Sequence, residues 1–214
     1  MIDGDEPGYS ARVTGHWDEL APVLEGALVR LEPLDSAHEE SLHDAASDPE
    51  LWRWMPFNAS SADQFKRWIS QMLEESAAGR QSTFVTIDRA SGLPLGSTSY
   101  LALRPEHRGL EIGWTWLRRD AWRSGVNVET KLLLLGHAFD KLDCIRVEFK
   151  TDALNERSRK ALEGIGAKFE GVLRSHMIVR ADVIRDSAYY SVIAAEWPET
   201  RDWLERRLAK HEPK

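Results

Sequence analysis

Hydrophobic and polar residues alternate in seven stretches of the chain, and this alternation is typical of β-strands that bury one face. The expected strands cover residues 27–34, 83–88, 94–103, 110–117, 145–150, 167–173 and 188–195. No helical pattern separates the second, third and fourth of them. We therefore expect these three strands to form an antiparallel meander.

Elsewhere hydrophobic residues recur at every third or fourth position, which predicts amphipathic helices. Asp35 or Ser36 can cap a helix that runs to residue 46. Ser60 or Ser61 can cap a second helix, which closes at Gly79. Further helical patterns cover residues 128–142, 156–164 and 203–208. The resulting order, β-α-α-β-β-β-α-β-α-β-β, predicts an α/β (α+β) fold in which a mixed sheet carries helices on both faces.

Length and composition indicate one globular domain with extensions. The chain has 214 residues, of which 42% are hydrophobic and 29% are charged, and these values are ordinary for a folded protein. Because periodicity is weak before residue 27, we expect an N-terminal extension over residues 1–26. The domain itself is expected over residues 27–198, and a C-terminal helix or tail over residues 199–214.

Charge and cysteine content narrow the range of partners. A net charge of −7 gives no electrostatic support for binding nucleic acid, and it mildly favours a cationic partner such as a protonated amine. The single cysteine, Cys144, cannot form an intrachain disulfide, which suits a reducing cytoplasm.

No apolar run approaches the roughly 18 residues that span a bilayer, so we expect a cytoplasmic protein without a membrane partner. His38 and His43 lack the spacing of a helical metal pair, and we expect no metal site.

The segment between the fourth strand and the long central helix is the first candidate binding site. A helix N-terminus presents unpaired N–H groups and a positive dipole end, and both attract phosphate. Gly125 lets the backbone turn closely around an anion, and Arg123 can add a charged contact. Asn127 is a suitable N-cap, so the alternative that Gly125 and Asn127 form only a turn and a cap stays open. The segment matches neither G-x-G-x-x-G nor the P-loop, which argues against both of those nucleotide-binding classes.

A second candidate segment, residues 151–171, passes from a strand through a helix into a tight turn at Gly166. Asn155 is a suitable N-cap for this helix, and Ser158 follows it at the third helical position. The alternative is that both side chains only satisfy the N–H groups of the helix end.

Taken together, these segments resemble the GNAT acetyltransferases. The shared order is a strand, a glycine-tipped loop, a helix, a second strand and then the pattern N-x-x-S-x-x-A-L-x-x-x-G-A, which begins here at Asn155. Three further phrases resemble the RimJ/RimL-like branch of ribosomal-protein N-terminal acetyltransferases: LVRLEPL at residues 28–34, EIGW at 111–114 and DSAYYS at 186–191. The resemblance extends over residues 27–198.

The resemblance implies the GNAT acyl-CoA N-acyltransferase fold, whose mostly antiparallel sheet splays between the fourth and fifth strands. It also implies acetyl-coenzyme A as the donor, with direct transfer and no acyl-enzyme. Asn155 and Ser158 would contact the cofactor and the reacting thiolate, to which the Ser158 hydroxyl can donate a proton. The pantetheine arm would pair with main-chain groups at Trp116 and Leu117, and the pyrophosphate would rest on the N–H groups of Arg123, Ser124, Gly125, Val126, Asn127 and Val128.

The chain departs from the family pattern at two positions. Trp122 stands where the family often has Arg or Gln, and Asn127 stands where it usually has Gly or Ala. Both changes keep the main-chain N–H donors, so the expected phosphate site stays.

Transfer to an amine needs a base, because the amine must lose a proton before it attacks a thioester carbonyl. Glu111 is the first candidate, since it begins an otherwise apolar strand and so can lie at the cleft. The alternative for Glu111 is an edge carboxylate that pairs with Arg104 or Arg108. Glu148 and His176 are weaker candidates for the base.

The expected function is therefore transfer of an acetyl group from acetyl-coenzyme A to a primary amine, at a peptide N-terminus or on a small molecule. A non-catalytic acyl-CoA binding or sensing module is the main alternative, and an aminoglycoside- or metabolite-modifying enzyme of the same fold is another. The presence of Asn155 and Ser158 beside a candidate base favours an enzyme over a sensor. We expect residues 52–57 and 174–187 to select the acceptor, and a homodimer stays open.

Overall fold

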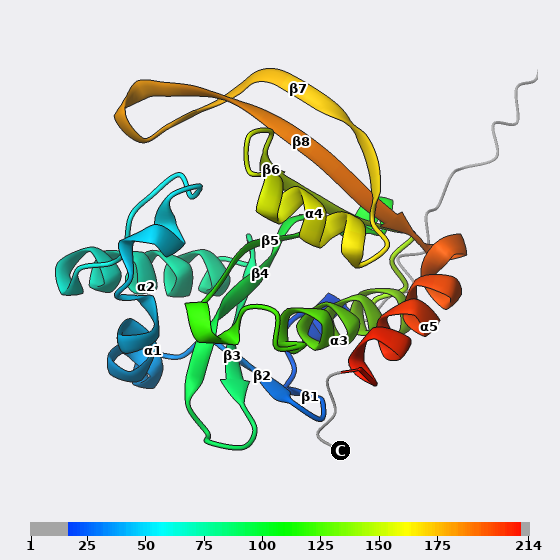
Figure 1. Cartoon of the computed structure of the whole chain (residues 1–214), viewed down its shortest axis with the longest axis horizontal. Coiled ribbons are helices and arrows are strands. Elements are labelled where there is room, and N and C mark those ends of the chain that lie inside the picture. Colours follow the sequence, from blue (N-terminus) through cyan, green and yellow to red (C-terminus); the bar gives the residue numbers. More distant parts are fainter. Residues whose placement is uncertain (1–16, 211–214) are drawn as a thin grey trace, which may run out of the picture.

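The computed structural model describes residues 17–210 and contains one eight-stranded sheet (Figure 1). Its strands, in spatial order, are β1 (Leu24–Glu25), β2 (Val29–Pro33), β3 (Ser82–Asp88), β4 (Pro94–Arg104), β5 (Gly109–Leu117), β6 (Arg146–Asp152), β8 (Val183–Ile193) and β7 (Lys168–Val179). All neighbouring strands are antiparallel except β5 and β6. The expected mostly antiparallel mixed sheet is therefore confirmed. Residues 1–16 of the expected N-terminal extension, and residues 211–214 of the tail, lie outside the described residues.

Helices cover both faces of the sheet, and each face has its own core. Helices α1 (Glu39–Ala46) and α2 (Ala62–Ala77) pack on one face, where Leu42 and Phe65 join a buried cluster. Helices α3 (Val126–Asp140), α4 (Glu156–Gly164) and α5 (Trp197–Leu208) bury side chains such as Leu134, Leu162 and Leu204 in the other cluster. None of the helices within residues 17–210 is long and apolar enough to cross a membrane.

The helix ends confirm several capping predictions and correct two of them. Asp35 caps a short 3₁₀ turn that leads into α1, and Ser61 caps α2. Asn127, however, is not the N-cap of α3, because the helix begins at Val126 and Gly125 takes the cap position with φ of +93°. A residue in this left-handed conformation turns the chain directly into the helix, so Asn127 already lies in the first turn. Helix α5 likewise begins at residue 197 rather than 203, since a proline in its first turn fits a helix start.

The sheet opens between β5 and β6, the fourth and fifth of the expected strands. The two strands pair only over residues 109–111 and 146–148, and they diverge beyond Glu111. On its other side β5 bulges against β4, and Trp114 takes a positive φ of +48° at the bulge. The divergence leaves one edge of β5 from residue 112 to residue 117 without a strand partner among the described residues. The splay that the resemblance implied is therefore confirmed.

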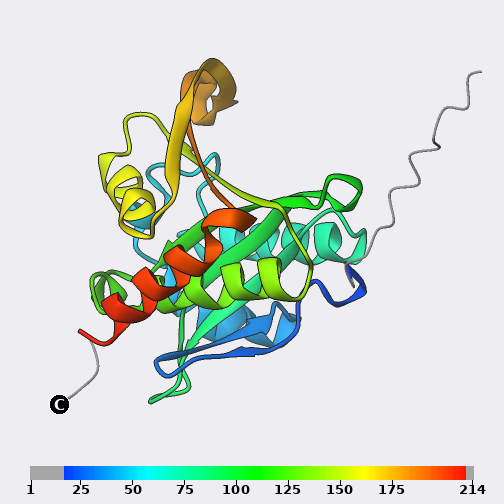
Figure 2. The ribbon, with the colours of Figure 1, turned by 90° about the vertical axis from the view of Figure 1, so that its right-hand side faces the viewer.

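Strands β7 and β8 form a long two-stranded ribbon that projects from the body of the molecule (Figures 1 and 2). The sequence pattern ended one expected strand at residue 173 and began the next at residue 188, but most of residues 174–187 belong to the two strands. A register shift between Leu173 and Met177 breaks the alternation of side chains, which is why the sequence pattern hides the strands there. At the ribbon's tip the Arg180 side chain donates a hydrogen bond to the carbonyl of Arg53. The ribbon therefore reaches the segment that follows the 3₁₀ turn at Pro49–Trp52.

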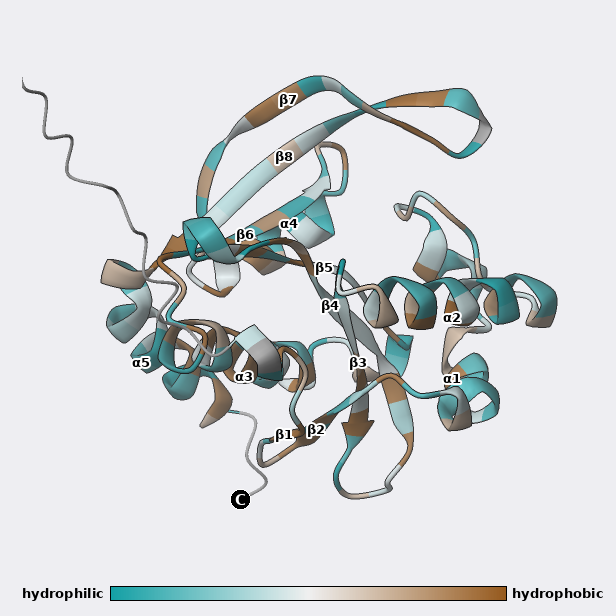
Figure 3. Ribbon diagram, turned by 180° about the vertical axis from the view of Figure 1, so that it is seen from behind, coloured by the Kyte–Doolittle hydropathy of each residue, from teal (hydrophilic) through white to brown (hydrophobic). Residues whose placement is uncertain are grey.

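The ribbon also carries exposed apolar side chains, in contrast to the buried apolar centre of the sheet (Figure 3). Ile178 and Ile184 pair across the two strands near the tip and are mostly exposed. The ribbon is thus the part of the described chain where apolar residues gather outside the core.

Candidate active site

The loop between β5 and α3 has the geometry of an anion-binding turn. Arg123 and Gly125 both take positive φ values, +62° and +93°. The Ser124 hydroxyl donates to the carbonyl of Ala121 at 2.7 Å, which closes the turn. Within residues 17–210 the N–H groups of Asn127 and Val128 donate no hydrogen bond. These donors at the positive end of the α3 dipole can bind a phosphate group.

A buried carboxylate fixes the first turn of α3 in place. Glu129 is 5% exposed and accepts the N–H groups of Ala27, Leu28 and Val29, each at 2.7 Å. A Cβ atom at Gly26 would lie 2.4 Å from the Glu129 carboxyl carbon, so only glycine allows this approach. The negative charge also suits the first turn of a helix. The loop that precedes α3 is therefore anchored to the edge of the sheet.

Asn155 caps α4, as the sequence predicts. Its side-chain oxygen accepts the N–H of Ser158 at 3.1 Å, and Asn155 is 7% exposed. The Ser158 hydroxyl itself makes no hydrogen bond within the described part of the chain. The alternative that Ser158 serves the cap through its side chain is therefore wrong, and its hydroxyl is free to meet a ligand.

The two helix starts lie together at the mouth of the opening between β5 and β6. The Arg157 guanidinium, in the first turn of α4, lies 3.9 Å from the centre of the Trp122 ring. The Trp122 indole in turn donates to the carbonyl of Leu117 at 2.7 Å. This contact connects the loop before α3 with the start of α4.

Trp116 and Leu117, which are expected to pair with the pantetheine arm, contribute main-chain groups rather than side chains to the opening. Trp116 is 4% exposed, and its ring packs on Trp52 and Trp68 with centroid distances of 5.2 and 6.0 Å. Its side chain is thus core, as is that of Leu117. Beyond Glu111 the main chain of β5 faces the gap that β6 leaves. An extended amide chain can add to such an unpaired edge.

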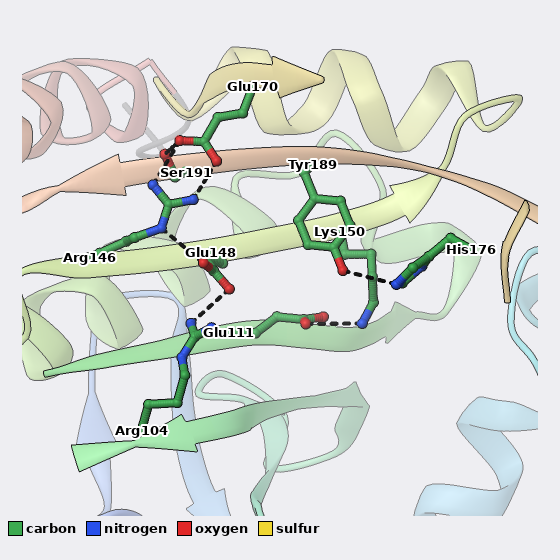
Figure 4. A network of polar contacts seen from close by, with 9 residues as sticks. All are labelled: Arg104, Glu111, Arg146, Glu148, Lys150, Glu170, His176, Tyr189 and Ser191. Carbon is green, nitrogen blue, oxygen red and sulfur yellow. Dashed lines mark hydrogen bonds and ion pairs between the residues drawn. The ribbon is translucent and has the colours of Figure 1, made fainter. Parts of the chain in front are cut away.

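Glu111 lies at the closed end of the opening and is buried. It is 4% exposed, and its carboxylate accepts a hydrogen bond from Lys150 of β6 at 3.1 Å (Figure 4). The alternative pairing with Arg104 or Arg108 is wrong, because Arg104 binds Glu148 at 2.7 Å and Arg108 binds Asp143. Glu111 is thus a buried carboxylate at the cleft, as the strand pattern suggested.

Glu148 is held in a separate chain of ion pairs. It binds Arg104 at 2.7 Å and Arg146 at 2.9 Å, and Arg146 continues to Glu170 and Ser191 (Figure 4). Burial opposes ionisation of Glu148, but the hydrogen bonds from the two arginines outweigh it and hold the pKa of Glu148 below its usual range. A carboxylate held in this way is a poor proton acceptor. Glu148 therefore stabilises the ribbon rather than serving as a base.

His176 is half-buried in the ribbon rather than free on its surface. Its Nδ1 lies 3.0 Å from the Ser187 hydroxyl. Its Nε2 lies 3.4 Å from the Tyr189 hydroxyl (Figure 4). Burial and the nearby charges of Lys150 and Arg185 lower the pKa of His176. The imidazole is therefore neutral at pH 7. Tyr189 shares this face, whereas the adjacent tyrosine at 190 is fully buried in the core.

Sequence reasoning missed Lys150, Asp152 and Arg185. The signal was present in β6, where the sequence RVEFKTD alternates charged with uncharged positions. Its four charged residues share one face of the strand, and on that face Glu148 pairs with Arg104 and Lys150 pairs with Glu111. Within residues 17–210 no group of three or more His, Cys, Asp or Glu side chains could hold a metal ion.

Aromatic side chains pack together beside the bulge of β5. Phe57 packs edge-on against Trp114 at the β5 bulge, with ring centroids 5.4 Å apart, and also contacts Trp52. Trp52 itself is fully buried and donates to the carbonyl of Ala46. Of residues 52–57, expected to select the acceptor, Phe57 and the partly buried Met55 are therefore closer to the opening's surface than Trp52.

Comparisons with known proteins agree with this arrangement. A family model described as an acetyltransferase (GNAT) domain matches residues 29–168. The chain is 28% identical over 169 residues to "Putative ribosomal N-acetyltransferase YdaF" of Bacillus subtilis (strain 168), which covers 78% of this chain and 90% of that protein. It is 38% identical to a putative acetyltransferase from T. thermophilus, with a TM-score of 0.79 over 87% of this chain and 96% of the other. A GCN5-related N-acetyltransferase from Brucella melitensis is 29% identical, with a TM-score of 0.82 over 90% of this chain and 86% of the other.

Proposed function

The chain belongs to the GNAT acetyltransferase family and transfers an acetyl group to an amine, and we propose that acetyl-coenzyme A is its donor and a peptide N-terminus its acceptor. The likeness to a relative named as a ribosomal N-acetyltransferase supports the RimJ/RimL-like branch and a peptide acceptor. One arrangement carries the proposal. Strands β5 and β6 separate beside the starts of α3 and α4, where hydrogen-bond donors are free, and the buried Glu111 lies at the closed end of the opening between the two strands.

The donor would lie along the opening between β5 and β6. The N–H groups of Asn127 and Val128, which bond to nothing within residues 17–210, support a pyrophosphate site in the loop of residues 123–128. The unpaired edge of β5 near Trp116 and Leu117 supports an extended pantetheine arm there. Asn155 and Ser158 would stand on the α4 side of the same opening. When bound, the donor supplies the activated acetyl group.

The proton steps would be shared between Glu111 and Ser158. Glu111 takes the proton that the acceptor nitrogen must lose as it bonds to the acetyl carbon. The Ser158 hydroxyl, free of any bond within the described residues, donates to the sulfur as the carbon–sulfur bond breaks. The ion pair with Lys150 holds the Glu111 side chain at the closed end of the opening.

A transfer assay tests this function. Release of free thiol from acetyl-coenzyme A is measured against a panel of peptide N-termini and small-molecule amines, and the acetylated product is identified by mass spectrometry. We expect turnover with at least one class of peptide N-terminus. Tight binding of acetyl-coenzyme A without transfer to any amine would support the sensing module instead. Turnover of small amines alone would overturn the peptide acceptor and keep the transferase.

A further inference from the structure

Arg185 on β8 is a buried arginine that makes no hydrogen bond within the described chain. It is 7% exposed, and its Nε is shut off from solvent without a partner. Neither terminal nitrogen forms a hydrogen bond within residues 17–210. A guanidinium carries five N–H donors, and buried polar groups of this kind are almost always satisfied. An unsatisfied one therefore indicates a missing hydrogen-bond acceptor.

The neighbouring carboxylate does not supply that acceptor. Asp152 Oδ2 lies 4.0 Å from the Arg185 Nε, which is beyond hydrogen-bond distance. The other oxygen of Asp152 accepts the N–H of Leu154 at 2.9 Å. Because Asp152 pairs with Ser187 at the end of β6, Arg185 lies beyond the last residue of that strand. The main chain of β8 at Arg185 therefore has no partner on β6.

Arg185 belongs to the group of charged side chains around Glu111. Asp152, which lies 4.0 Å from the Arg185 Nε, stands two positions after Lys150 on the same face of β6, and Lys150 donates to Glu111 at 3.1 Å. Burial lowers the pKa of Arg185. An arginine stays protonated under these conditions. The two cations Lys150 and Arg185 thus balance the two carboxylates before any acceptor arrives.

We propose that Arg185 binds a carboxylate group of the acceptor, so that the preferred acceptor is an amine with a carboxylate close by. The planar fork of a guanidinium matches a carboxylate through two parallel hydrogen bonds. A zwitterionic acceptor adds one positive and one negative charge, so the net charge of the group around Glu111 and Arg185 does not change. A phosphate dianion would add a net negative charge beside Asp152 and Glu111. The orientation, with the amine toward Glu111, rests on the proposed function.

An open hollow of about 900 Å³ lies beside this cluster. His176, whose Nδ1 lies 3.0 Å from the Ser187 hydroxyl on β8, is one of the residues that line the hollow. The residues around this hollow are Val172, Leu173, Arg174, Ser175, His176 and Asp186. The carboxylate can come from two sources, an acidic side chain near a peptide N-terminus or the α-carboxylate of a free amino acid.

Matched acceptors separate these sources and test the role of Arg185. The first pair is the peptide amide Ala-Asp-Ala and its Ala-Asn-Ala counterpart, and the second is alanine and alaninamide. We expect the acidic member of at least one pair to have a kcat/KM about ten-fold higher or more. Arg185→Gln should raise KM for that acidic acceptor by about ten-fold and leave its uncharged counterpart within about two-fold. Arg185→Lys keeps the charge without the fork and should recover part of the preference.

The control removes a charge far from the site. Arg67→Gln changes an exposed arginine on α2 and should leave both kcat/KM values unchanged. Binding of acetyl-coenzyme A, measured by calorimetry, shows whether Arg185→Gln is still folded. A parent protein without preference for either acidic acceptor would overturn the proposal, as would an equal loss for both members of a pair. Dependence on Arg185 for phosphoethanolamine alone would also overturn it.

A binding arm keeps the proposal distinct from the proposed function. The dissociation constants of N-acetyl-Ala-Asp-Ala amide, N-acetyl-Ala-Asn-Ala amide, N-acetylalanine and N-acetylalaninamide are measured for the parent and for Arg185→Gln. A preference for an acidic compound that Arg185→Gln removes supports the carboxylate site even if no amine is acetylated. Equal binding by the two proteins, with turnover intact, would refute the site and leave the transferase function standing.

Discussion

The Lys150 ammonium on β6 lies 3.1 Å from the Glu111 carboxylate on β5, just beyond the point where the two strands stop pairing (Figure 4). The ion pair therefore ties the two sides of the opening together at its closed end. Removal of one partner of a buried pair leaves an uncompensated charge and costs about 3–5 kcal/mol. Glu111→Gln leaves the ammonium of Lys150 unpaired, and this is the more exposed partner, with 21% of its side chain exposed against 5% for Glu111. A neutral isostere at Glu111 is therefore a gentler test of the carboxylate than removal of Lys150.

Glu111→Gln should lower kcat by about 100-fold or more, because it keeps the side chain's size and removes the proton acceptor. Binding of acetyl-coenzyme A, measured by calorimetry, should stay within about two-fold of the parent, since Glu111 lies away from the expected phosphate site.

Glu148→Gln is the matched control for Glu111→Gln. It removes a carboxylate that two arginines already occupy, so it should cost stability and leave kcat near the parent value. Near-normal turnover of Glu111→Gln would assign the proton to another group. The neutral His176 would then be the next candidate.

Gly125→Val should weaken the binding of acetyl-coenzyme A by about ten-fold or more, which corresponds to about 1.4 kcal/mol. The φ of +93° is strained for a β-branched residue, and the new side chain would stand where the loop must approach the phosphate. Isothermal titration calorimetry measures the change. Gly92→Val provides the control, because Gly92 has a φ of +73° in an exposed turn with no atom within 4 Å of an added Cβ. Equal affinity of Gly125→Val and the parent would refute the loop as the phosphate site.

Much of the fold could be predicted because its signals are local. Alternation along β3, β4 and β5 identified the meander, and Asn155 was correctly assigned as the cap of α4. The start of α3 was misjudged, because the positive φ that makes Gly125 the cap leaves no side-chain signal. The two strands of the ribbon were predicted too short for a similar reason. At the register shift three residues of β7 lie opposite one residue of β8, and this breaks the alternation of hydrophobic and polar residues.

The site was harder to predict than the fold, because its contacts join distant parts of the chain. Glu111 was found from its own strand, but its partner Lys150 is 39 positions away and is set by the register of β5 against β6. Arg185 can be recognised as a candidate binding residue only when its burial and its hydrogen bonds are known, because an arginine in a strand gives no such signal in the sequence. The periodicity of a short segment therefore predicts a helix or a strand. A charge pair across the sheet can be predicted only when the arrangement of the strands is known.

Ser158→Ala should lower kcat by about one to three orders of magnitude while the affinity for acetyl-coenzyme A stays within a few-fold. The cap of α4 uses the Ser158 N–H and the Asn155 side chain, and alanine keeps that N–H. The loss would therefore report the hydroxyl alone, measured by steady-state kinetics on a protein of parental stability.

Asn155→Ala is the matched control for Ser158→Ala. It removes the cap and should cost about 1 kcal/mol of stability in urea unfolding. Unchanged kcat in a folded Ser158→Ala protein would end the case for a proton donor at this position.

Lys131 on α3 is a buried amine without a carboxylate partner among residues 17–210. It is 3% exposed, and its Nζ donates to Thr115 at 2.8 Å and to Thr98 at 3.4 Å. Burial lowers the pKa of Lys131 to about 7. The two threonine hydroxyls also bond to each other at 2.7 Å, so they keep a partner if the amine is removed.

This shift makes the stability of the protein depend on pH in a defined direction. Between pH 7 and about 10.4 the unfolded chain holds a proton on Lys131 that the folded chain has lost, so stability rises with pH across this window. Below pH 7 both states are protonated and the full penalty of the buried charge applies.

Lys131→Met removes the titration and should be more stable than the parent at pH 7 by an amount on the order of a few kcal/mol. Urea unfolding at pH 7, 8 and 9 should show this advantage shrinking as pH rises, whereas exposed Lys66→Met should show none. An advantage of Lys131→Met that stays constant with pH would mean that the gain comes from packing alone and that Lys131 titrates normally.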